Sequence, residues 1–452
     1  MKIQDKISFY TALFGAKTVN QGLHLFNSPG TSLPGVVAMK ISKNFLSFLS
    51  KYCKKGIITV TGTNGKTTTS GLFAHILKTA QNTVLHNEKG ANMLSGMATS
   101  LAVGYKPFSR FDYAVLESDE AYLTKFYDFI KANYLFVTNL FRDQLDRYGE
   151  LDTTAKKIQE AISKNPDLKI FINADDPMLS ELGKDNKKIL FGFEKIEFNN
   201  IQKDSQTQAE TILCSCKEDL SYEEKYYDHI GKYYCKNCGK KRQIPNYKGF
   251  AKIYDDYNEI IVKFEANNEE KELKFQSHLV GLYNAYNALA AISGALELGL
   301  NQKTIQKGLD TYQSAFGRAH KLVLDGKNIL IQLIKNPTGA SEVLRTVNEN
   351  TCKKLLLAIN DNYADGRDIS WLWDTDFEKL AHYPISVTIT GIRAYDMAVR
   401  LKYAGFDESK ITINQNLKEA LQTSLNEIEQ GEQLLIMPTY TALLEIQKFL
   451  QK

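Results

Sequence analysis

The chain of 452 residues lacks a strong charge of either sign, and this absence excludes several classes of partner. Its 56 basic residues nearly balance its 52 acidic residues, and the formal net charge is +4. Proteins that bind nucleic acid or an anionic membrane by charge usually carry a clear excess of Lys and Arg. We therefore expect no nucleic-acid partner, and the overall composition gives no electrostatic reason to expect a membrane-surface protein.

Long apolar runs are also missing. No stretch approaches the roughly 20 apolar residues that a membrane-spanning helix needs. The first residues, MKIQDKISFYTALFGAK, have charges within their apolar stretches and no small-residue cleavage site, so they do not resemble a secretory signal. We expect a cytoplasmic protein, although a protein whose substrate sits in a membrane would give the same result.

Cysteine is scarce, and its distribution is uneven. Four of the six cysteines lie between positions 214 and 238, which favours a metal site in a reducing compartment over scattered disulfides. The two isolated ones, Cys53 and Cys352, have apolar neighbours and are predicted to be core residues.

The clustered cysteines form two pairs, Cys214-x-Cys216 and Cys235-x-x-Cys238, a spacing close to that of a zinc ribbon. Four thiolates would complete a tetrahedral shell, so we predict a structural zinc ion that holds a small insertion together. The first pair is one residue shorter than usual, which leaves the geometry of Cys214 open, and reduced thiols without metal are the alternative. His229 is a reserve ligand, although a surface position is favoured for it.

Short apolar runs alternate with helical stretches along most of the chain, as in IITV followed by TTTSGLFAHILKTA. This order is typical of parallel strands joined by helices, and it predicts an α/β fold with a doubly wound sheet. A second alternation, which begins at Lys327, predicts a Rossmann-like C-terminal α/β domain. We expect an N-terminal lead-in at 1–53, a central domain at 54–317 with an insertion at 207–245, and the C-terminal domain at 318–452.

A glycine-rich segment lies directly between the first apolar run and a helical stretch. This strand-loop-helix context is the one in which a GKT sequence binds nucleotide phosphates. Backbone N–H groups and the helix N-terminus attract the phosphates, Lys66 adds a charge, and the Thr67 hydroxyl can reach magnesium. The residues assigned to ATP here are Gly62, Thr63, Asn64, Gly65, Lys66, Thr67 and Thr68.

Polar residues follow the next two predicted strands. Glu117 ends the run AVLE at the sheet edge where open α/β proteins bind ligands, and a carboxylate there suits magnesium. A solvated acid that caps a helix is the alternative. Asn139 occupies the equivalent place after YLFVT and is either part of the site or polar loop.

Six segments in a fixed order resemble the ATP-dependent Mur ligase superfamily: GTNGKTTT, LESDEA, TNLFRDQLDRYGELD, NADDP, GLYNAYNALAA and FGRAH. The resemblance implies that ATP converts a carboxylate to an acyl phosphate, which a nitrogen nucleophile then displaces. It also implies that Lys66, Thr67 and Glu117 bind phosphate and magnesium. By the same resemblance Asn287 contacts adenine, and Arg318 reaches the nucleotide from the domain junction.

Val60 replaces the leading glycine of the general phosphate loop, which is in keeping with the Mur ligases. Two departures from ordinary Mur ligases point to a narrower group: Gln144 stands where they have histidine, and Lys335-Asn336 replaces an aspartate-alanine-histidine pattern. The stretch LLLAINDNYADGRDISWLWDTDFE is similar to the MurT family. This implies a heterodimer with a GatD-type glutamine amidotransferase subunit that binds the C-terminal domain and supplies ammonia.

The implied reaction amidates the α-carboxylate of D-glutamate in the lipid II stem peptide to D-isoglutamine, at the inner face of the membrane, for peptidoglycan synthesis. In this family an aspartate of the NDNYADGRD stretch is proposed to complete the partner's Cys-His catalytic triad. Asp361, directly after a predicted strand, is the first choice, and Asp365 and Asp368 are the alternatives. These acids could also simply shape a turn.

Two other functions remain open at the level of sequence. The chain could be a self-sufficient Mur or folylpolyglutamate-type ligase that adds an amino acid, although the missing histidine pattern opposes this. It could also be a nucleotide-binding regulatory protein with an inactive ligase fold, which the intact Lys66, Thr67 and Glu117 oppose.

Overall fold

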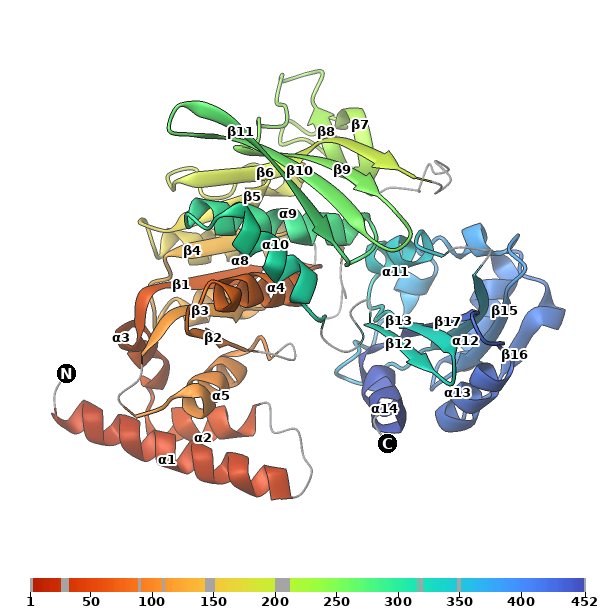
Figure 1. Ribbon diagram of the computed structural model, residues 1–452, viewed down its shortest axis with the longest axis horizontal. Helices are drawn as coiled ribbons and strands as arrows, with labels where there is room; N and C mark the ends of the chain where they lie inside the picture. Colours follow the sequence, from red (N-terminus) through yellow and green to blue (C-terminus); the bar gives the residue numbers. More distant parts are fainter. Residues whose placement is uncertain are drawn as a thin grey trace.

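A computed structural model describes residues 3–25, 32–87, 91–107, 110–142, 151–199, 212–314, 317, 320–347 and 351–450. A helical N-terminal segment lies against a large central sheet, and a second sheet forms the C-terminal part (Figure 1). No helix in the described ranges is long and apolar enough to cross a membrane.

The central sheet has nine strands in the order β11-β10-β9-β6-β5-β4-β1-β3-β2. Strands β1 to β6 and β9 are parallel, and β9, β10 and β11 form an antiparallel meander at one edge. The bounds are β1 Cys53–Thr61, β2 Val84–His86, β3 Phe111–Glu117, β4 Tyr134–Val137, β5 Lys169–Asn173, β6 Lys188–Phe198, β9 Tyr247–Ile253, β10 Asn258–Ala266 and β11 Glu269–Ser277.

Helices cover both faces of this sheet, because alternate residues of its strands enter two separate cores. In β1, Ile58 and Val60 belong to one core and Ile57 to the other. The first core contains α4 Lys66–Thr79, α9 Leu282–Glu297 and α10 Gln302–Thr311. The second contains α1 Ile3–Leu25, α2 Leu33–Ile41, η1 Phe45–Phe48, α3 Leu49–Tyr52, α5 Leu94–Gly104, α6 Glu120–Phe126, α8 Leu151–Ser163 and η2 Pro177–Leu179.

The C-terminal sheet has the order β12-β13-β17-β14-β15-β16 and is parallel except for β12. Its strands are β12 His320–Leu324, β13 Lys327–Ile331, β14 Cys352–Ala358, β15 Ser386–Thr390, β16 Ile411–Ile413 and β17 Gln433–Pro438. Helices α11 Pro337–Leu344 and α12 Ala394–Tyr403, with η3 Ser370–Leu372 and η4 Phe377–Leu380, pack on one face. Helices α13 Leu417–Asn426 and α14 Tyr440–Leu450 pack on the other face, and η5 Glu408–Lys410 precedes β16.

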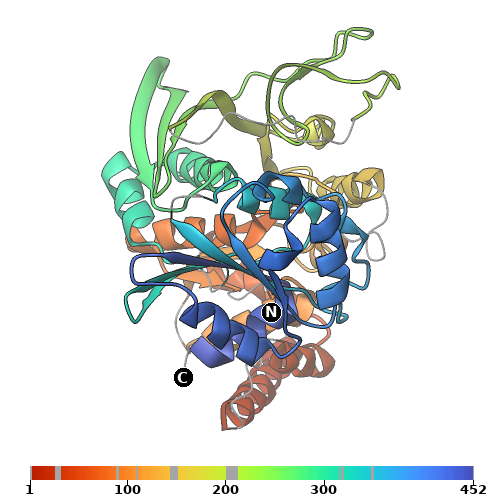
Figure 2. The ribbon, with the colours of Figure 1, turned by 90° about the vertical axis from the view of Figure 1, so that its right-hand side faces the viewer.

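The predicted insertion is a small unit of its own. Its hairpin, β7 Ser221–Tyr227 and β8 Ile230–Tyr234, forms a separate two-stranded sheet in the upper part of the molecule (Figures 1 and 2). The α/β class, the parallel central sheet, the small insertion and the C-terminal α/β unit are all confirmed.

Two local features differ from the expectation. The second half of the lead-in at 1–53, where the pattern from Val36 to Tyr52 predicts one helix, is interrupted, because α2 ends at Ile41 and a 3-10 turn precedes the short α3. The edge strand β12 was not anticipated, since its residues lie before Lys327, where the apolar alternation begins.

Candidate active site and metal centre

The phosphate loop has a backbone that requires glycine at two positions. Gly62 has φ +124° and Gly65 has φ +84°, both in the region that favours glycine. A Cβ on Gly62 would lie 2.3 Å from Thr138 Oγ1, and a Cβ on Gly65 would lie 2.1 Å from Asn287 Oδ1. Gly65 also caps the N-terminus of α4, so the loop brings the positive end of that helix to the phosphate position.

Lys66 is buried at the start of α4. Its Nζ donates hydrogen bonds to the carbonyl of Gly62 and, at 2.9 Å, to Glu120 Oε1. Burial alone would lower the pKa of Lys66, but the carboxylates of Glu120, Asp119 and Glu117 raise it, so the ammonium stays charged. The sequence placed Glu120 in a motif without a role, and the structure makes it the partner of Lys66.

Glu117 lies at the carboxyl end of β3, in register with Val60 of β1. Its side chain is only 2% exposed, and Oε2 has no hydrogen-bond partner among the described residues. A buried carboxylate oxygen without a donor is costly unless a cation occupies the site. The buried Oε2 of Glu117 therefore suits a magnesium ion, and Thr67, the other predicted ligand, lies in the first turn of α4.

Asn139 holds the phosphate loop in shape, so it is part of the site and is not simply a polar loop residue. Its Oδ1 accepts from the backbone N–H of Asn64 at 2.8 Å, and its Nδ2 donates to the carbonyl of Asn64 at 3.1 Å. Its own carbonyl accepts from the N–H of Thr63 at 2.9 Å. These three hydrogen bonds fix the segment before Gly65.

The structure describes two of the three other residues predicted to bind the nucleotide. Asn287 is buried beneath the loop, where its Oδ1 accepts from Thr69 Oγ1 at 3.2 Å, and contact with adenine stays a prediction. Thr68 is buried in the first turn of α4. Arg318 lies outside the described residues.

The phosphate loop is joined directly to the C-terminal part. Asn64 and Asn336 exchange two side-chain hydrogen bonds, of 3.0 and 3.3 Å. Asn336 is also the N-cap of α11, where its Oδ1 accepts from the N–H of Gly339 at 2.8 Å. Burial raises the pKa of Glu120, and the charges of Lys66 and, to a smaller extent, the neighbouring Lys335 oppose this rise. Lys335-Asn336, which replaces the ordinary Mur ligase pattern at this position, thus lies next to the phosphate loop.

The tip of the β7–β8 hairpin lies in the same junction. Asp228 Oδ2 accepts from Thr338 Oγ1, in the first turn of α11, at 2.5 Å. His229 Nε2 lies 3.3 Å from Asp176 Oδ1, and its Nδ1 lies 3.4 Å from Asp228 Oδ1. Burial opposes the charged form of His229, but the two carboxylates raise its pKa to about 10.

His229 is only 1% exposed, and its ring packs against Phe141 at 4.8 Å. The expected surface position is therefore wrong. His229 is also not among the residues whose ligand atoms cluster with the cysteines, so its reserve metal role is unsupported.

The insertion is anchored by a buried ion pair that sequence reasoning missed. Arg242 Nε donates to Asp175 Oδ1 at 2.6 Å, and Asp175 Oδ2 accepts from Tyr286 at 2.7 Å. Burial raises the pKa of Asp175, and Arg242 counteracts this. Asp175 belongs to the NADDP motif at the end of β5, so the motif attaches the insertion to the central sheet.

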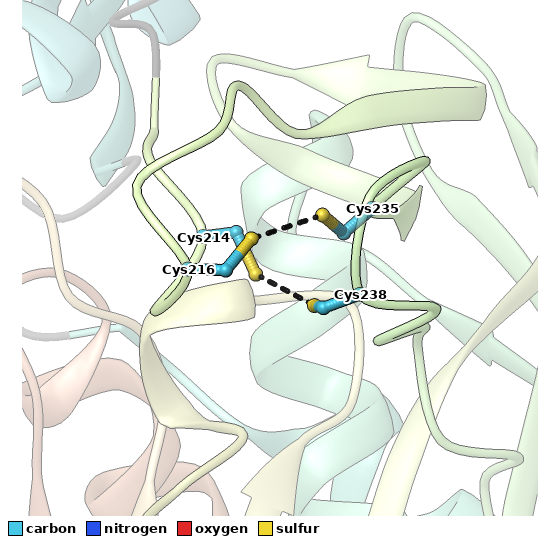
Figure 3. Close-up of side chains that lie close together, drawn as sticks. All are labelled: Cys214, Cys216, Cys235 and Cys238. Carbon is cyan, nitrogen blue, oxygen red and sulfur yellow. Dashed lines mark hydrogen bonds between the residues drawn. The ribbon is translucent and has the colours of Figure 1, made fainter.

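The four clustered cysteines point toward a common centre (Figure 3). Their sulfur atoms all lie within 4.8 Å of one another, with 3.5 Å for Cys214–Cys238 and for Cys216–Cys235. Zinc–sulfur bonds of about 2.3 Å in a tetrahedron place sulfurs roughly 3.8 Å apart, so the set fits a zinc ion.

Each cysteine pair forms a short turn. In the first, the N–H of Lys217 donates to the carbonyl of Cys214 at 2.8 Å, and Lys217 has φ +70°. A hydrogen bond from the backbone of Cys216 lowers the pKa of Cys214 to about 6, which favours the thiolate that a metal needs. The short C-x-C spacing is therefore compatible with ligation by Cys214. Cys53 is part of the second core's edge and Cys352 is fully buried, and burial raises both pKa values to about 12.

The three candidate aspartates of the C-terminal part have different surroundings. Asp361 follows β14 and is paired with Arg393 at 2.7 Å. Asp365 accepts from the N–H and the hydroxyl of Thr441 and from the N–H of Asn362. Asp368 caps the turn at Ser370. Asp365 and Asp368 thus shape the loop, whereas the carboxylate of Asp361, 6% exposed, pairs with a side chain that is 37% exposed.

Comparisons with known proteins agree with this geometry. A Mur ligase middle-domain model matches residues 60–295, and a MurT ligase C-terminal model matches residues 333–443. The MurT subunit of lipid II isoglutaminyl synthase (glutamine-hydrolyzing) from Streptococcus pneumoniae is 37% identical over 93% of this chain and 92% of its own. The corresponding subunit from Staphylococcus aureus strain COL is 35% identical over 96% of each chain.

Solved structures show the same fold at low sequence identity. A pseudomurein peptide ligase type C from Methanothermus fervidus has a TM-score of 0.68 and 21% identity, with 89% of this chain and 80% of that chain covered. MurF ligase from Thermotoga maritima in complex with ADP has a TM-score of 0.62 and 13% identity, with 91% and 83% covered. The chain belongs to the Mur ligase family and, within it, to the MurT family.

Proposed function

We propose that this chain is the ATP-using subunit of a glutamine-dependent carbon–nitrogen ligase that amidates D-glutamate in the stem peptide of lipid II. The product is D-isoglutamine, and the process is peptidoglycan synthesis. The observation that carries the proposal is the contact between a complete phosphate loop and the first turn of α11, made by Asn64 and Asn336. The names of the two close relatives support the choice of substrate.

The proposed reaction has two steps. An oxygen of the α-carboxylate attacks the γ-phosphorus of ATP, ADP leaves, and an acyl phosphate forms. Ammonia then attacks the acyl carbon, a carbon–nitrogen bond forms, and phosphate leaves with the electrons of the carbon–oxygen bond while a proton passes to solvent. The loop N–H groups and Lys66 would stabilise the charge on the transferred phosphoryl group.

The proposed nucleotide site consists of Gly62 to Thr68, together with Asn287 and Arg318. Thr67 and Glu117 would hold Mg²⁺, which supplies charge neutralisation on the phosphates. The buried Oε2 of Glu117, which has no hydrogen-bond partner among the described residues, supports this assignment.

Ammonia is proposed to come from a separate GatD-type glutaminase that binds residues 318–452. Asp361 would orient the imidazole of the partner's Cys-His pair, because a triad carboxylate holds the histidine in the productive tautomer. The side chain of Asp361 is only 6% exposed and that of Arg393, its present partner, is 37% exposed, so the partner's imidazole would have to displace Arg393 to reach Asp361.

A structural zinc ion is proposed at Cys214, Cys216, Cys235 and Cys238. Metal analysis of the purified chain should find one zinc per chain, and Cys238→Ser should remove most of it. Cys352→Ser is the matched control, since Cys352 is buried in the C-terminal sheet and should leave the zinc content unchanged.

The proposed function is tested by incubating the chain with ATP, magnesium and lipid II in detergent. Ammonium alone should support amidation, and a GatD-type partner with glutamine should replace ammonium. Addition of an amino acid in place of ammonia would favour a self-sufficient ligase. ATP binding without turnover from either nitrogen source would favour a regulatory protein.

A further inference from the structure

Helix α1 exposes a continuous apolar stripe. Its members recur at intervals of four, three and four residues, which places them on one side of a helix. They are Ile3, Ile7, Tyr10 and Phe14, which are 77%, 61%, 51% and 76% exposed. Large exposed apolar side chains that share one helix face indicate an interaction surface, whereas single ones do not.

The opposite side of α1 is already packed. Phe9, Ala12, Leu13 and Ala16 are buried in the core that α1 shares with the central sheet. The exposed stripe is therefore not needed to hold α1 on the protein. A helix that is apolar on both sides is expected to be covered on both sides.

The charge of this segment differs from that of the rest of the chain. Residues 1–56 contain eight lysines, no arginine, one aspartate and no glutamate, a formal charge of +7. The whole chain has a net charge of +4, so residues 57–452 carry −3. The near-balance of the complete sequence conceals a strongly basic N-terminal segment next to the apolar stripe.

The position of α1 suits contact with a flat partner. In both ribbon views α1 forms the lower edge of the molecule, away from the insertion at the top (Figures 1 and 2). The helix lies lengthwise along that edge and is not long and apolar enough to span a bilayer. An apolar stripe with adjacent lysines is the pattern of a helix that lies in the plane of a membrane interface.

We propose that α1 docks the protein on an anionic bilayer. The side chains of Ile3, Ile7 and Phe14 enter the headgroup region, and the surrounding lysines contact lipid phosphates. The advantage to the enzyme rests on the proposed function, because a lipid-linked substrate lies in that plane. Lipid binding itself can be measured without turnover.

The test is sedimentation of the full-length chain with phosphatidylcholine vesicles, with and without about a third of phosphatidylglycerol. The unmodified chain should bind the anionic vesicles and bind neutral vesicles at least about tenfold more weakly. The double variant Ile7→Ser/Phe14→Ser should lose about tenfold or more in partitioning, because each side chain removes apolar area from water. Lys6→Gln should weaken binding to the anionic vesicles, because Lys6 is exposed on α1 and its helical spacing places it beside Ile3 and Tyr10.

Ile244→Ser is the matched control, since Ile244 is 75% exposed in the insertion, and it should bind as the unmodified chain does. Equal vesicle binding by the Ile7/Phe14 variant and the unmodified chain would overturn docking by α1. So would a dimer in sedimentation velocity that the same variant splits, because the stripe would then bind a second copy.

Failure of docking and failure of the proposed function give different results. In detergent, the Ile7/Phe14 variant should amidate lipid II at the normal rate, and in vesicles more slowly. Absence of amidation by the unmodified chain in detergent would contradict the proposed function, while the vesicle-binding result would stand.

Discussion

Lys66 meets its ligand already paired with a carboxylate. The Lys66–Glu120 pair is buried, and a buried pair is strongly destabilised when one member is removed. A phosphate that enters the loop can take the place of Glu120 as the anionic neighbour of Lys66. The pair therefore keeps the ammonium charged and positioned before ATP binds.

Gly65 is predicted to be irreplaceable, and Gly299 is its matched control. Both have positive φ, +84° and +80°, but a Cβ at Gly65 would meet Asn287 at 2.1 Å, whereas Gly299 has nothing within 4 Å. Gly299→Ala should cost about 1 kcal/mol in the free energy of unfolding. Gly65→Ala should cost more and weaken ATP binding at least about tenfold. Urea unfolding and nucleotide titration check this, and equal behaviour of the two variants would contradict it.

The buried His229 predicts a pH dependence of stability. Its pKa is raised to about 10 in the folded chain, against an ordinary value near 6.5 when unfolded. The stabilisation is therefore complete below about pH 6.5 and is lost as pH rises toward 10, by a few kcal/mol. Unfolding free energies measured from pH 6 to pH 10 should fall more steeply for the unmodified chain than for His229→Gln. Parallel curves would show that the imidazolium contributes nothing.

At the scale of elements, the first turn of α11 is where three parts of the molecule meet. Asn336 contacts the phosphate loop, and Thr338 contacts the tip of the β7–β8 hairpin. The hairpin is in turn linked by His229 to Asp176, which accepts from the N–H of Leu140 directly after Asn139. A closed series of contacts thus links the phosphate loop, α11 and the cysteine-containing insertion.

Asn336→Ala should separate the role of this contact from helix capping. Asn301 is the matched control, because it caps α10 in the same way, by accepting from the N–H of Thr304, without touching the site. Each substitution should cost about 1 kcal/mol in stability through the lost cap. Asn336→Ala alone should also lower the amidation rate with ammonium, by about tenfold, because Asn64 loses its partner. Similar activity in both variants would show that Asn336 only caps α11 and that its contact with Asn64 does not affect the reaction.

The elements differ in how far the sequence could predict them. The loop from Gly62 to Thr67 was predictable because all of its groups are contiguous and its glycine positions follow from local backbone geometry. The Asn64–Asn336 pair joins residues that are 272 positions apart, and no local sequence pattern predicts such a contact. His229 was misjudged for the same reason, since its burial depends on Phe141 and Asp176, which lie far from it in the sequence.

Residue spacing also could not decide whether Cys214 belongs to the cysteine cluster, or which aspartate is the candidate for the partner's triad. The C-x-C spacing alone could not show that the turn at Lys217 brings Cys214 to the other sulfurs. Asp365 is distinguished from Asp361 by hydrogen bonds to Thr441, which lies at the start of a distant helix, so residue spacing alone could not separate the two acids.

At the scale of the whole molecule, two chemistries are divided between subunits in the proposed enzyme. In that proposal ATP would be used at the central sheet, and ammonia would be released on a partner that binds the C-terminal sheet. A residue that serves only the glutaminase should therefore affect one nitrogen source and not the other. In the proposed function, Asp361 is the residue of this chain that serves the glutaminase.

Asp361→Asn should abolish glutamine-driven amidation and leave ammonium-driven amidation within about twofold, because the neutral amide cannot hold the partner histidine as an imidazolium. Rates with each nitrogen source, measured on the complex with the glutaminase, check this. Asp365→Asn is the control, since an amide nitrogen in place of Oδ2 cannot accept from the hydroxyl of Thr441 or the N–H of Asn362, and the change should lower stability by about 1–3 kcal/mol. Equal loss of both activities in Asp361→Asn, with stability unchanged, would remove Asp361 from the triad and assign it to the synthetase site itself.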